Sequence, residues 1–235
     1  YEEAHTPYQW HQKMFSFARK IGITIFSTPF DETAVDLLES LRTPAYKIAS
    51  FELIDLQLIR YVARKGKPMI LSTGMSDADE IGLALETARE AGCKDLAILH
   101  CISGYPTPLE EANLSLITEL QKKFNVQVGL SDHTTGITAS IVGTALGATI
   151  IEKHFTLSRS QGGVDSEFSL EPNEMQELIT HCKNTKKAMG TGEFKRKNLE
   201  LENKIFRRSL YFVEDIMSGE IIKSHHIRRI RPGYG

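Results

Sequence analysis

Short apolar segments alternate with amphipathic ones along most of this chain. The apolar segments are 22 to 30 residues apart from start to start, which is the length of one strand plus one crossover helix. Their near-continuous apolar character is typical of parallel strands covered on both faces. The pattern predicts a serial βα architecture with six visible strands, at Ile23–Phe26, Ala45–Ala49, Pro68–Leu71, Leu96–Ile102, Val126–Leu130 and Ala148–Ile151.

The helices between these segments carry local start and stop signals. Asp31 is a candidate N-cap for a helix over Glu32–Arg42, and Asp77 opens a capping-box-like start that Gly92 closes after Ala91. Two further helices are expected at Tyr8–Lys20 and Asn173–Met189.

A closed barrel and an open doubly wound sheet both have this alternation. The chain has no G-x-G-x-x-G after its first strand, and polar residues end all six strands rather than meeting at one switch point. Both facts favour an α/β fold of the (β/α)8 TIM-barrel type. Six units are two short of eight, so we interpret them as strands three to eight, with the first two upstream of Tyr1.

The pattern changes near residue 192. We assign residues 1–192 to the barrel, 193–206 to a polar, basic linker, and 207–235 to the truncated start of a small β-rich domain. Its opening hairpin is predicted to pair Ser209–Val213 with Ile221–Ile222 across a turn at Met217-Ser218-Gly219. So few apolar residues do not make an independent core.

Composition narrows the class of protein. The 235 residues are 41% hydrophobic and 25% charged, no apolar run is long enough to cross a bilayer, and no secretory signal follows Tyr1. Three cysteines show no metal or redox spacing, which favours a cytoplasmic setting.

Charge is unevenly distributed along the chain. The net charge is −2, but the tail at 195–235 has 10 basic and only 5 acidic residues. Because no nucleic-acid motif accompanies this tail, an arginine-rich element over an anionic substrate is the preferred interpretation.

Polar side chains gather where the strands end. In a barrel they would share one mouth, where hydroxyls and a lysine suit a phosphate or carboxylate. Taken singly, a serine or threonine at a strand end is usually a turn or cap residue. The set comprises Ser27, Thr28, Lys47, Ser50, Ser72, Thr73, His100, Ser103, Tyr105, Ser131, Asp132, His133, Lys153 and His154.

Three positions in this region each have a functional and a structural interpretation. Lys47, inside an apolar strand, either reaches the solvent from the rim or binds phosphate or forms a Schiff base. His133 and His154 end consecutive strands, so they are either core histidines or two ligands of an incomplete metal site.

A second histidine pair, His225-His226, lies in the segment 207–235. It has no carboxylate partner nearby in the sequence and is expected to face the solvent.

The segment Ser158–Ser169 follows the last expected strand. It contains Gly162-Gly163 and Asp165, so it is either a flexible lid whose carboxylate binds sugar hydroxyls or a solvated turn.

Five ordered motifs together resemble the sialic acid synthase family, whose members condense phosphoenolpyruvate with an N-acetylated amino sugar. The resemblance covers essentially all of residues 1–192. The motifs are Lys47-Ile48-Ala49-Ser50, Leu71-Ser72-Thr73-Gly74-Met75, His100-Cys101 through Tyr105-Pro106-Thr107-Pro108, Gly129-Leu130-Ser131-Asp132-His133 and Glu152-Lys153-His154-Phe155.

The resemblance implies a (β/α)8 barrel followed by an antifreeze-like (SAF) domain, matched here by Ser209-Leu210-Tyr211, Gly219-Glu220 and Arg231-Pro232-Gly233. It also implies a homodimer in which the SAF domain of one subunit covers the mouth of the other. His133 and His154 would ligate Mn²⁺ or Mg²⁺, and Tyr105 and Asp165 would face the acceptor sugar. Phosphoenolpyruvate would be held by Thr28, Lys47, Ser50, Ser72 and Ser131.

Two stretches are closer to the pseudaminic acid branch of this family than to the neuraminate and legionaminate branches. They are Tyr1-Glu2-Glu3-Ala4 and the run from Gly162 to Pro172. Ser103 stands where the neuraminate branch commonly has asparagine, and we include it as a candidate donor to phosphate or carboxylate.

Other functional classes remain open at this level. A Schiff-base aldolase would use Lys47 or Lys153, and a non-catalytic barrel would bind a phosphorylated metabolite. Under the synthase hypothesis, Lys47, His133 and His154 form the catalytic set, with no nucleic acid and no membrane as partner.

Overall fold

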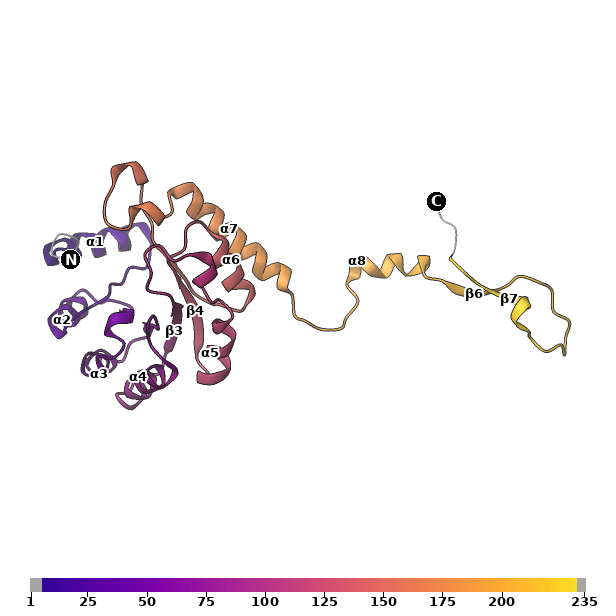
Figure 1. Cartoon of the computed structure of the whole chain (residues 1–235), viewed down its shortest axis with the longest axis horizontal. Coiled ribbons are helices and arrows are strands. Elements are labelled where there is room, and N and C mark those ends of the chain that lie inside the picture. The colour runs from indigo at the N-terminus through magenta and orange to yellow at the C-terminus, as the bar shows by residue number, and fades with distance from the viewer. Residues whose placement is uncertain (1–5, 232–235) are drawn as a thin grey trace. The chain divides into compact units, whose positions relative to one another are not determined.

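The computed structural model describes residues 6–231, which form two compact units that divide between Gly190 and Thr191 (Figure 1). The motif residues Tyr1-Glu2-Glu3-Ala4 and Pro232-Gly233 lie outside the described part. Each unit is considered by itself below.

The first unit is built on a parallel sheet with strands in sequence order, β1-β2-β3-β4-β5. An open doubly wound sheet would reverse its strand order at a switch point, and the described strands show no reversal. The sheet is a curled half-barrel, so the α/β fold with serial βα units is confirmed. Its strands are β1 (Tyr46–Ile48), β2 (Met69–Ser72), β3 (Leu96–Cys101), β4 (Gln127–Asp132) and β5 (Ile151–Lys153).

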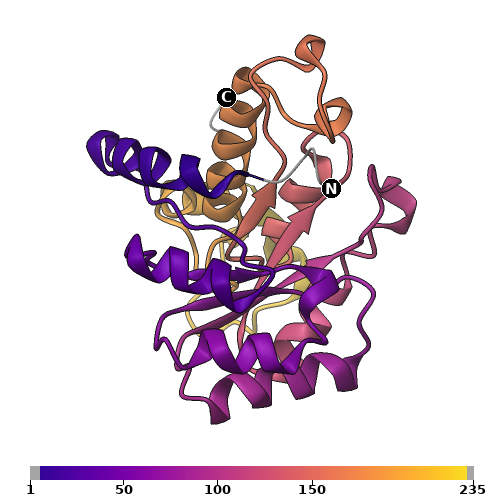
Figure 2. The same ribbon diagram turned by 90° about the vertical axis from the view of Figure 1, so that its left-hand side faces the viewer.

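Helices flank the sheet along its outer side (Figure 2). Two predicted caps are confirmed: the Asp31 side chain accepts a hydrogen bond from the Ala34 amide, and Asp77 forms a full capping box with Glu80. The helices of this unit are α1 (Tyr8–Ile21), α2 (Glu32–Ser40), α3 (Leu56–Ala63), α4 (Ala78–Glu90), α5 (Leu116–Phe124), α6 (Thr138–Ala145) and α7 (Pro172–Met189).

The hydrophobic core lies between the sheet and these helices. Ile48 and Leu71 from the strands and Val35 and Ile59 from the helices are fully buried in one cluster. Because β1 through β4 are buried along almost their whole length, these strands are held rigidly. The backbone that carries the side chains at their carboxyl ends is therefore fixed by close packing.

Two strand predictions need correction. Residues Ile23–Phe26 form no strand, because no neighbouring strand in the described part of the chain pairs with them, and Ile23 and Phe26 are exposed. The last strand is Ile151–Lys153 rather than Ala148–Ile151. Its first paired residue is Ile151, which lies opposite Leu130 on β4, so the apolar residues 148–150 precede the strand.

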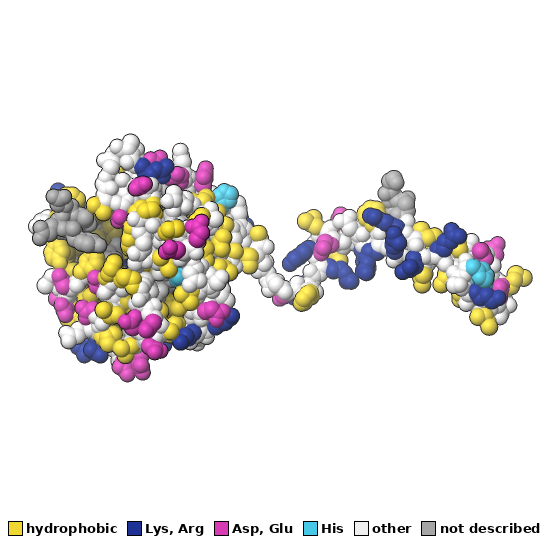
Figure 3. All heavy atoms as spheres, viewed as in Figure 1, with side chains coloured by type: hydrophobic (Ala, Val, Ile, Leu, Met, Phe, Trp, Pro, Cys, Tyr) yellow, Lys and Arg dark blue, Asp and Glu magenta, His cyan; other side chains and the backbone are white. Residues whose placement is uncertain are grey.

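The second unit contains α8 (Asn198–Leu201), β6 (Ser209–Phe212) and β7 (Ile227–Ile230). The predicted pairing of Ser209–Val213 with Ile221–Ile222 is wrong: β6 pairs antiparallel with β7. The connection is long, and residues 221–222 lie within it, exposed. Figure 3 shows many Lys and Arg side chains on this unit, in line with the charge count.

None of the helices found in residues 6–231 combines the length and the apolar character needed to cross a membrane.

Candidate active site

Lys47 is the centre of a polar cluster at the carboxyl ends of the strands. Its side chain is almost completely buried, and Nζ donates to Ser72 Oγ at 2.7 Å and lies 3.5 Å from Glu152 Oε1. Ser131 Oγ donates to the same Glu152 oxygen at 2.7 Å. Four strands thus contribute one side chain each to a connected network, and Lys47 does not extend to the solvent.

Ser50 and Ser103 approach each other across Gly74. The Gly74 amide donates to Ser50 Oγ at 3.0 Å. A Cβ built on Gly74 would lie 2.2 Å from Ser103 Oγ and 2.8 Å from Ser50 Oγ. Glycine is therefore required here because two hydroxyls converge on its Cα, which places both beside the β2 end of the cluster.

His133 and His154 lie side by side at the ends of β4 and β5, with ring centroids 5.3 Å apart. Two imidazoles that bind one cation through nitrogens at ~2.1 Å have centroids roughly 4.6–5.3 Å apart for right-angled to tetrahedral geometry. The observed separation fits a shared divalent cation. The two rings are therefore neighbours and do not lie in separate parts of the core.

The hydrogen bonds of His133 leave the correct atom for a metal. Its Nδ1–H donates to the Ile102 carbonyl at 2.9 Å, so the lone pair of the neutral ring is on Nε2. A backbone carbonyl that fixes the tautomer in this way is a regular feature of metal-ligating histidines. Cys101 Sγ lies 3.8 Å from the same Nδ1.

The two imidazoles differ in their electrostatic surroundings. Burial alone would lower the pKa of His133, but hydrogen bonding to Cys101 and Ile102 more than offsets this and raises it. Burial, together with repulsion from the nearby His133, lowers the pKa of His154. His154 is therefore the more readily neutral of the pair, as a metal ligand must be.

Tyr105, Phe168 and Asp165 surround the histidines. The Tyr105 ring lies 4.3 Å from the His133 ring and the Phe168 ring 5.0 Å from the His154 ring, centroid to centroid. Asp165 Oδ2 is 3.8 Å from His154 Nδ1. The loop that carries Asp165 thus reaches the histidine pair, as its lid interpretation requires.

This loop is tied to α7 at its base. Arg159 donates to both carboxylate oxygens of Glu174 and, through Nη1, to the Ser169 carbonyl. Ser169 Oγ in turn donates to the Asp165 carbonyl at 2.7 Å. These contacts hold the segment 158–169 in a defined path over His154.

Three candidates stand apart from the cluster. Thr28 is half-buried in the segment before α2, and no hydrogen bond of the described structure links it to the other candidates. His100 is a core histidine, whose Nε2 bonds the Ala112 carbonyl at 2.8 Å and whose pKa burial lowers. Lys153 is paired with Asp132 in the interior, so it is not available for a Schiff base.

Two acidic residues in the region were given no role from the sequence. Glu152 joins Lys47 to Ser131, and its signal was a carboxylate that directly follows the apolar run ending at Ile151. Glu52 has a buried Oε2 without a hydrogen-bond partner among the described residues, and burial raises its pKa. Such a residue gives no sequence signal, since its neighbours come from other segments.

The prediction that His225 and His226 lack carboxylate partners is wrong, and the prediction that they face the solvent holds for the exposed His225 but not for His226. His225 Nε2 lies 3.8 Å from Glu214 and His226 Nε2 lies 3.6 Å from Glu220, because the chain folds back before β7, and His226 is buried. Glu214 and the two histidines could approach one cation. However, the Lys223 amide donates to His226 Nδ1, which places the ring proton on Nε2 and removes that atom as a ligand.

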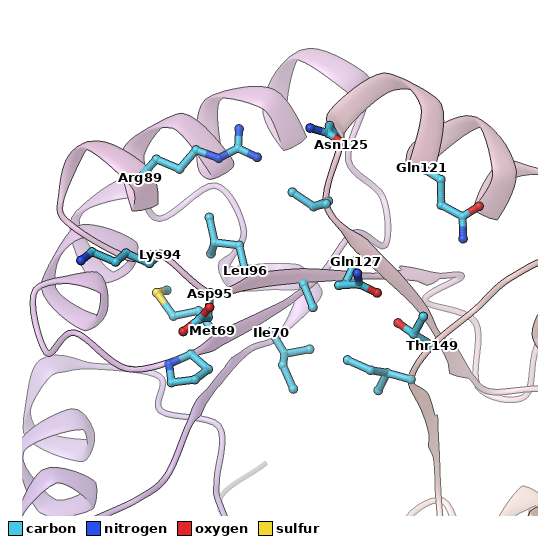
Figure 4. A pocket seen from close by; sticks show the side chains of 14 residues that line it. Met69, Ile70, Arg89, Lys94, Asp95, Leu96, Gln121, Asn125, Gln127 and Thr149 are labelled. Atoms are coloured by element: carbon cyan, nitrogen blue, oxygen red, sulfur yellow. The ribbon is translucent and has the colours of Figure 1, made fainter.

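A hollow of the first unit lies away from this cluster. It measures about 690 Å³ and is at the opposite, amino ends of the strands, lined by Asp95, Gln127 and Thr149 among others (Figure 4). In barrel proteins the chemistry is carried by the carboxyl ends and the amino end serves stability. We therefore place the candidate site at the histidine and lysine cluster.

Comparison with known proteins agrees with the sequence motifs. A family model described as the NeuB family matches residues 1–194. The pseudaminic acid synthase of Campylobacter jejuni is 41% identical over 235 residues, covering 100% of this chain and 68% of that protein. The N,N'-diacetyllegionaminic acid synthase of C. jejuni is 41% identical over 228 residues, covering 96% and 68%.

A solved structure gives the same result for the fold. The N-acetylneuraminic acid synthetase of Leptospira borgpetersenii, in complex with citrate, superposes with a TM-score of 0.81 at 33% identity, covering 85% of this chain and 70% of that one. The half-barrel with a histidine pair at its mouth thus defines this chain as a member of the sugar-acid synthase class. The chain belongs to the NeuB family, and the resemblance seen in its motifs is confirmed.

Proposed function

We propose that this protein is a transferase that condenses phosphoenolpyruvate with an N-acetylated, di-acetamido hexose. The products are a nine-carbon sialic-acid-like sugar acid, pseudaminic acid in our preferred assignment, and phosphate. One observation carries the proposal: the histidine pair, with its free Nε2 on His133, opens beside the network of Lys47, Ser72 and Glu152.

The histidine pair would hold a divalent metal ion, Mn²⁺ or Mg²⁺. When bound there, such an ion acts as a Lewis acid on a carbonyl oxygen. His133 is fixed for this role by the Ile102 carbonyl, and His154 is held between Phe168 and Asp165. Imidazole suits several divalent metals, so the donor set leaves the choice between the two ions to experiment.

Phosphoenolpyruvate would occupy the lysine side of the mouth. Its phosphate and carboxylate need donors and positive charge, which Lys47, Ser50, Ser72, Ser131 and Ser103 supply. Lys47 is already held by Ser72 and Glu152, so little conformational entropy is lost when the substrate binds. We retain Thr28 in this set, because its segment borders the mouth in our barrel assignment.

The acceptor sugar would lie under the loop at 158–169. Asp165 is positioned to accept hydrogen bonds from sugar hydroxyls, and the Tyr105 ring offers an apolar face beside His133. In the reaction, C3 of phosphoenolpyruvate adds to the aldehyde carbon of the open-chain sugar. The cation at C2 takes up water, and the resulting adduct expels phosphate. The protein positions both substrates and excludes bulk water from them.

We further propose that the half-barrel is part of a complete (β/α)8 barrel. A hollow of about 510 Å³ between β5, α7 and Phe26 supports this, since its lining includes Ile151, Leu178 and Ile179. Two strands from residues outside this sequence would fill it, and residues 23–26 would then have a partner to pair with.

The domain assignment keeps 1–192 as the synthase domain, 193–206 as a linker and 207–235 as the start of an SAF domain that mediates a homodimer. Exposed apolar side chains on β6, such as Leu210 and Phe212, support a further partner for this segment. Its basic charge suits a position near an anionic substrate. We propose a cytoplasmic location, because Cys93, Cys101 and Cys182 are free thiols.

Identification of the product tests the proposal. The purified protein is incubated with phosphoenolpyruvate, Mn²⁺ and candidate di-acetamido hexoses, and the nine-carbon acid is identified by mass and by its stereochemistry. We expect the pseudaminic precursor to be used best, with legionaminate or neuraminate synthesis as the alternative. Multiple-turnover phosphate release distinguishes an enzyme from a binding protein. Borohydride trapping of an adduct on Lys47 would instead indicate a Schiff-base aldolase.

A further inference from the structure

A buried ion pair lies directly behind the two histidines. Asp132 and Lys153 face each other in the ladder between β4 and β5, and Asp132 Oδ2 is 3.1 Å from Lys153 Nζ. The two side chains are 0% and 1% exposed. Each residue immediately precedes one of the candidate metal ligands, His133 and His154.

Every oxygen of this carboxylate is used. Oδ1 accepts hydrogen bonds from the amide and the hydroxyl of Thr134, both at 2.8 Å, and Oδ2 also accepts from Ser140 Oγ on α6 at 2.5 Å. Lys153 additionally donates to the Thr134 carbonyl. The pair therefore joins the end of β4, the turn that follows it, the end of β5 and helix α6.

Such a pair is a poor way to gain stability, because desolvation of both charges offsets most of their attraction. Burial indeed lowers the pKa of Lys153. What a fully bonded buried pair does provide is a fixed geometry. Since side chains alternate between the faces of a strand, fixing Asp132 and Lys153 on one face determines how His133 and His154 leave the other.

We propose that Asp132 and Lys153 are positioning residues that set the separation and orientation of the two metal-binding imidazoles. They do so without contact with metal or substrate. The inference rests on the proposed function in so far as the imidazoles bind a metal. Loss of the pair would let the ends of β4 and β5 move relative to each other, and metal affinity falls because a two-histidine site depends on both rings at once.

The test compares Mn²⁺ affinity, measured by electron paramagnetic resonance, across matched variants of the purified protein. Lys153→Met removes one charge. The double variant Asp132→Leu/Lys153→Met removes both, so that no unpaired buried charge prevents folding. The control is Glu119→Gln/Lys122→Gln, which removes an exposed ion pair. We expect Mn²⁺ to bind 10- to 100-fold more weakly in the double variant and as in wild type in the control.

The second measurement is the crystal structure of the metal-free double variant. We expect the separation between the His133 and His154 rings to differ from that in the wild type. A double variant with wild-type affinity and unchanged ring separation overturns the proposal, even if its melting temperature falls. Failure of the proposed function looks different. In that case the wild type does not bind Mn²⁺, or His133→Ala binds it equally well, while the ring separation still decides the positioning role.

Discussion

Lys47 and Glu152 form an asymmetric pair: Nζ lies 3.5 Å from Oε1, and the lysine side chain is 8% exposed while the glutamate side chain is 42% exposed. The cation is thus held in the interior of the mouth, while its counter-charge is on the open side. An incoming anion can approach the ammonium while Glu152 remains hydrated. This arrangement gives a buried lysine a counter-charge.

Replacing Lys47 tests the proposed phosphoenolpyruvate site. Lys47→Met keeps the length of the side chain but removes the charge, and we expect kcat/KM for phosphoenolpyruvate to fall about 10²–10³-fold, as for loss of one preorganised donor. The control Lys65→Met removes a surface partner of Asp36 and should retain wild-type kinetics. Steady-state phosphate release measures both. Wild-type kcat/KM in Lys47→Met would contradict the assignment.

Removal of either histidine tests the metal site. His133→Ala and His154→Ala should each abolish turnover and weaken Mn²⁺ binding, while circular dichroism shows an intact fold. His181→Ala, at an exposed position on α7, is the matched control and should behave as wild type. Chelation should likewise abolish turnover, and added Mn²⁺ or Mg²⁺ should restore it. Full activity in metal-free buffer would refute the role of the pair.

Gly74 offers a steric test at the same mouth. In Gly74→Ala the new methyl group must displace the hydroxyls of Ser50 and Ser103, so we expect a raised KM for phosphoenolpyruvate. Gly82→Ala is the control, since the nearest atom to its added Cβ is 3.7 Å away, in ordinary contact. Kinetics of the two variants provide the comparison. Equal KM values would show that Ser50 and Ser103 do not contact this substrate.

The contact between Arg159 and Glu174 predicts a pH dependence of the loop. Hydrogen bonding to Arg159 lowers the pKa of Glu174 below its ordinary 4.5. A carboxyl with a lowered pKa stabilises the folded loop above its ordinary pKa, and this contribution is lost as the pH falls through the lowered value. The contact should therefore persist at neutral pH and through mild acidity.

Carbon-13 NMR of the Glu174 carboxyl measures this directly. The midpoint should lie below 4.5 in the wild type and return toward that value in Arg159→Gln. The exposed variant Lys122→Gln should leave the titration of Glu174 unchanged. A midpoint that does not respond to Arg159→Gln would mean that the guanidinium does not hold the loop.

The alternation of apolar segments predicted the serial βα order and the side chains at the strand ends, and local capping patterns predicted the caps at Asp31 and Asp77. These depend on neighbours in the chain, through a period of hydrophobicity or a bond within one turn, so the sequence alone contains them. The five motifs likewise identified the family. The strand expected at Ile23–Phe26 shows the limit, because a strand exists only where another one pairs with it.

Tertiary structure decided which of those side chains meet. Only the folded sheet placed Glu152 between Lys47 and Ser131, turned Lys153 inward to Asp132, and paired β6 with β7 instead of residues 221–222. Each of these depends on register between segments that are distant in the chain, and a shift by one residue reverses the face of every side chain. Residue types gave the available chemistry, and the register of the ladder determined which groups could act together.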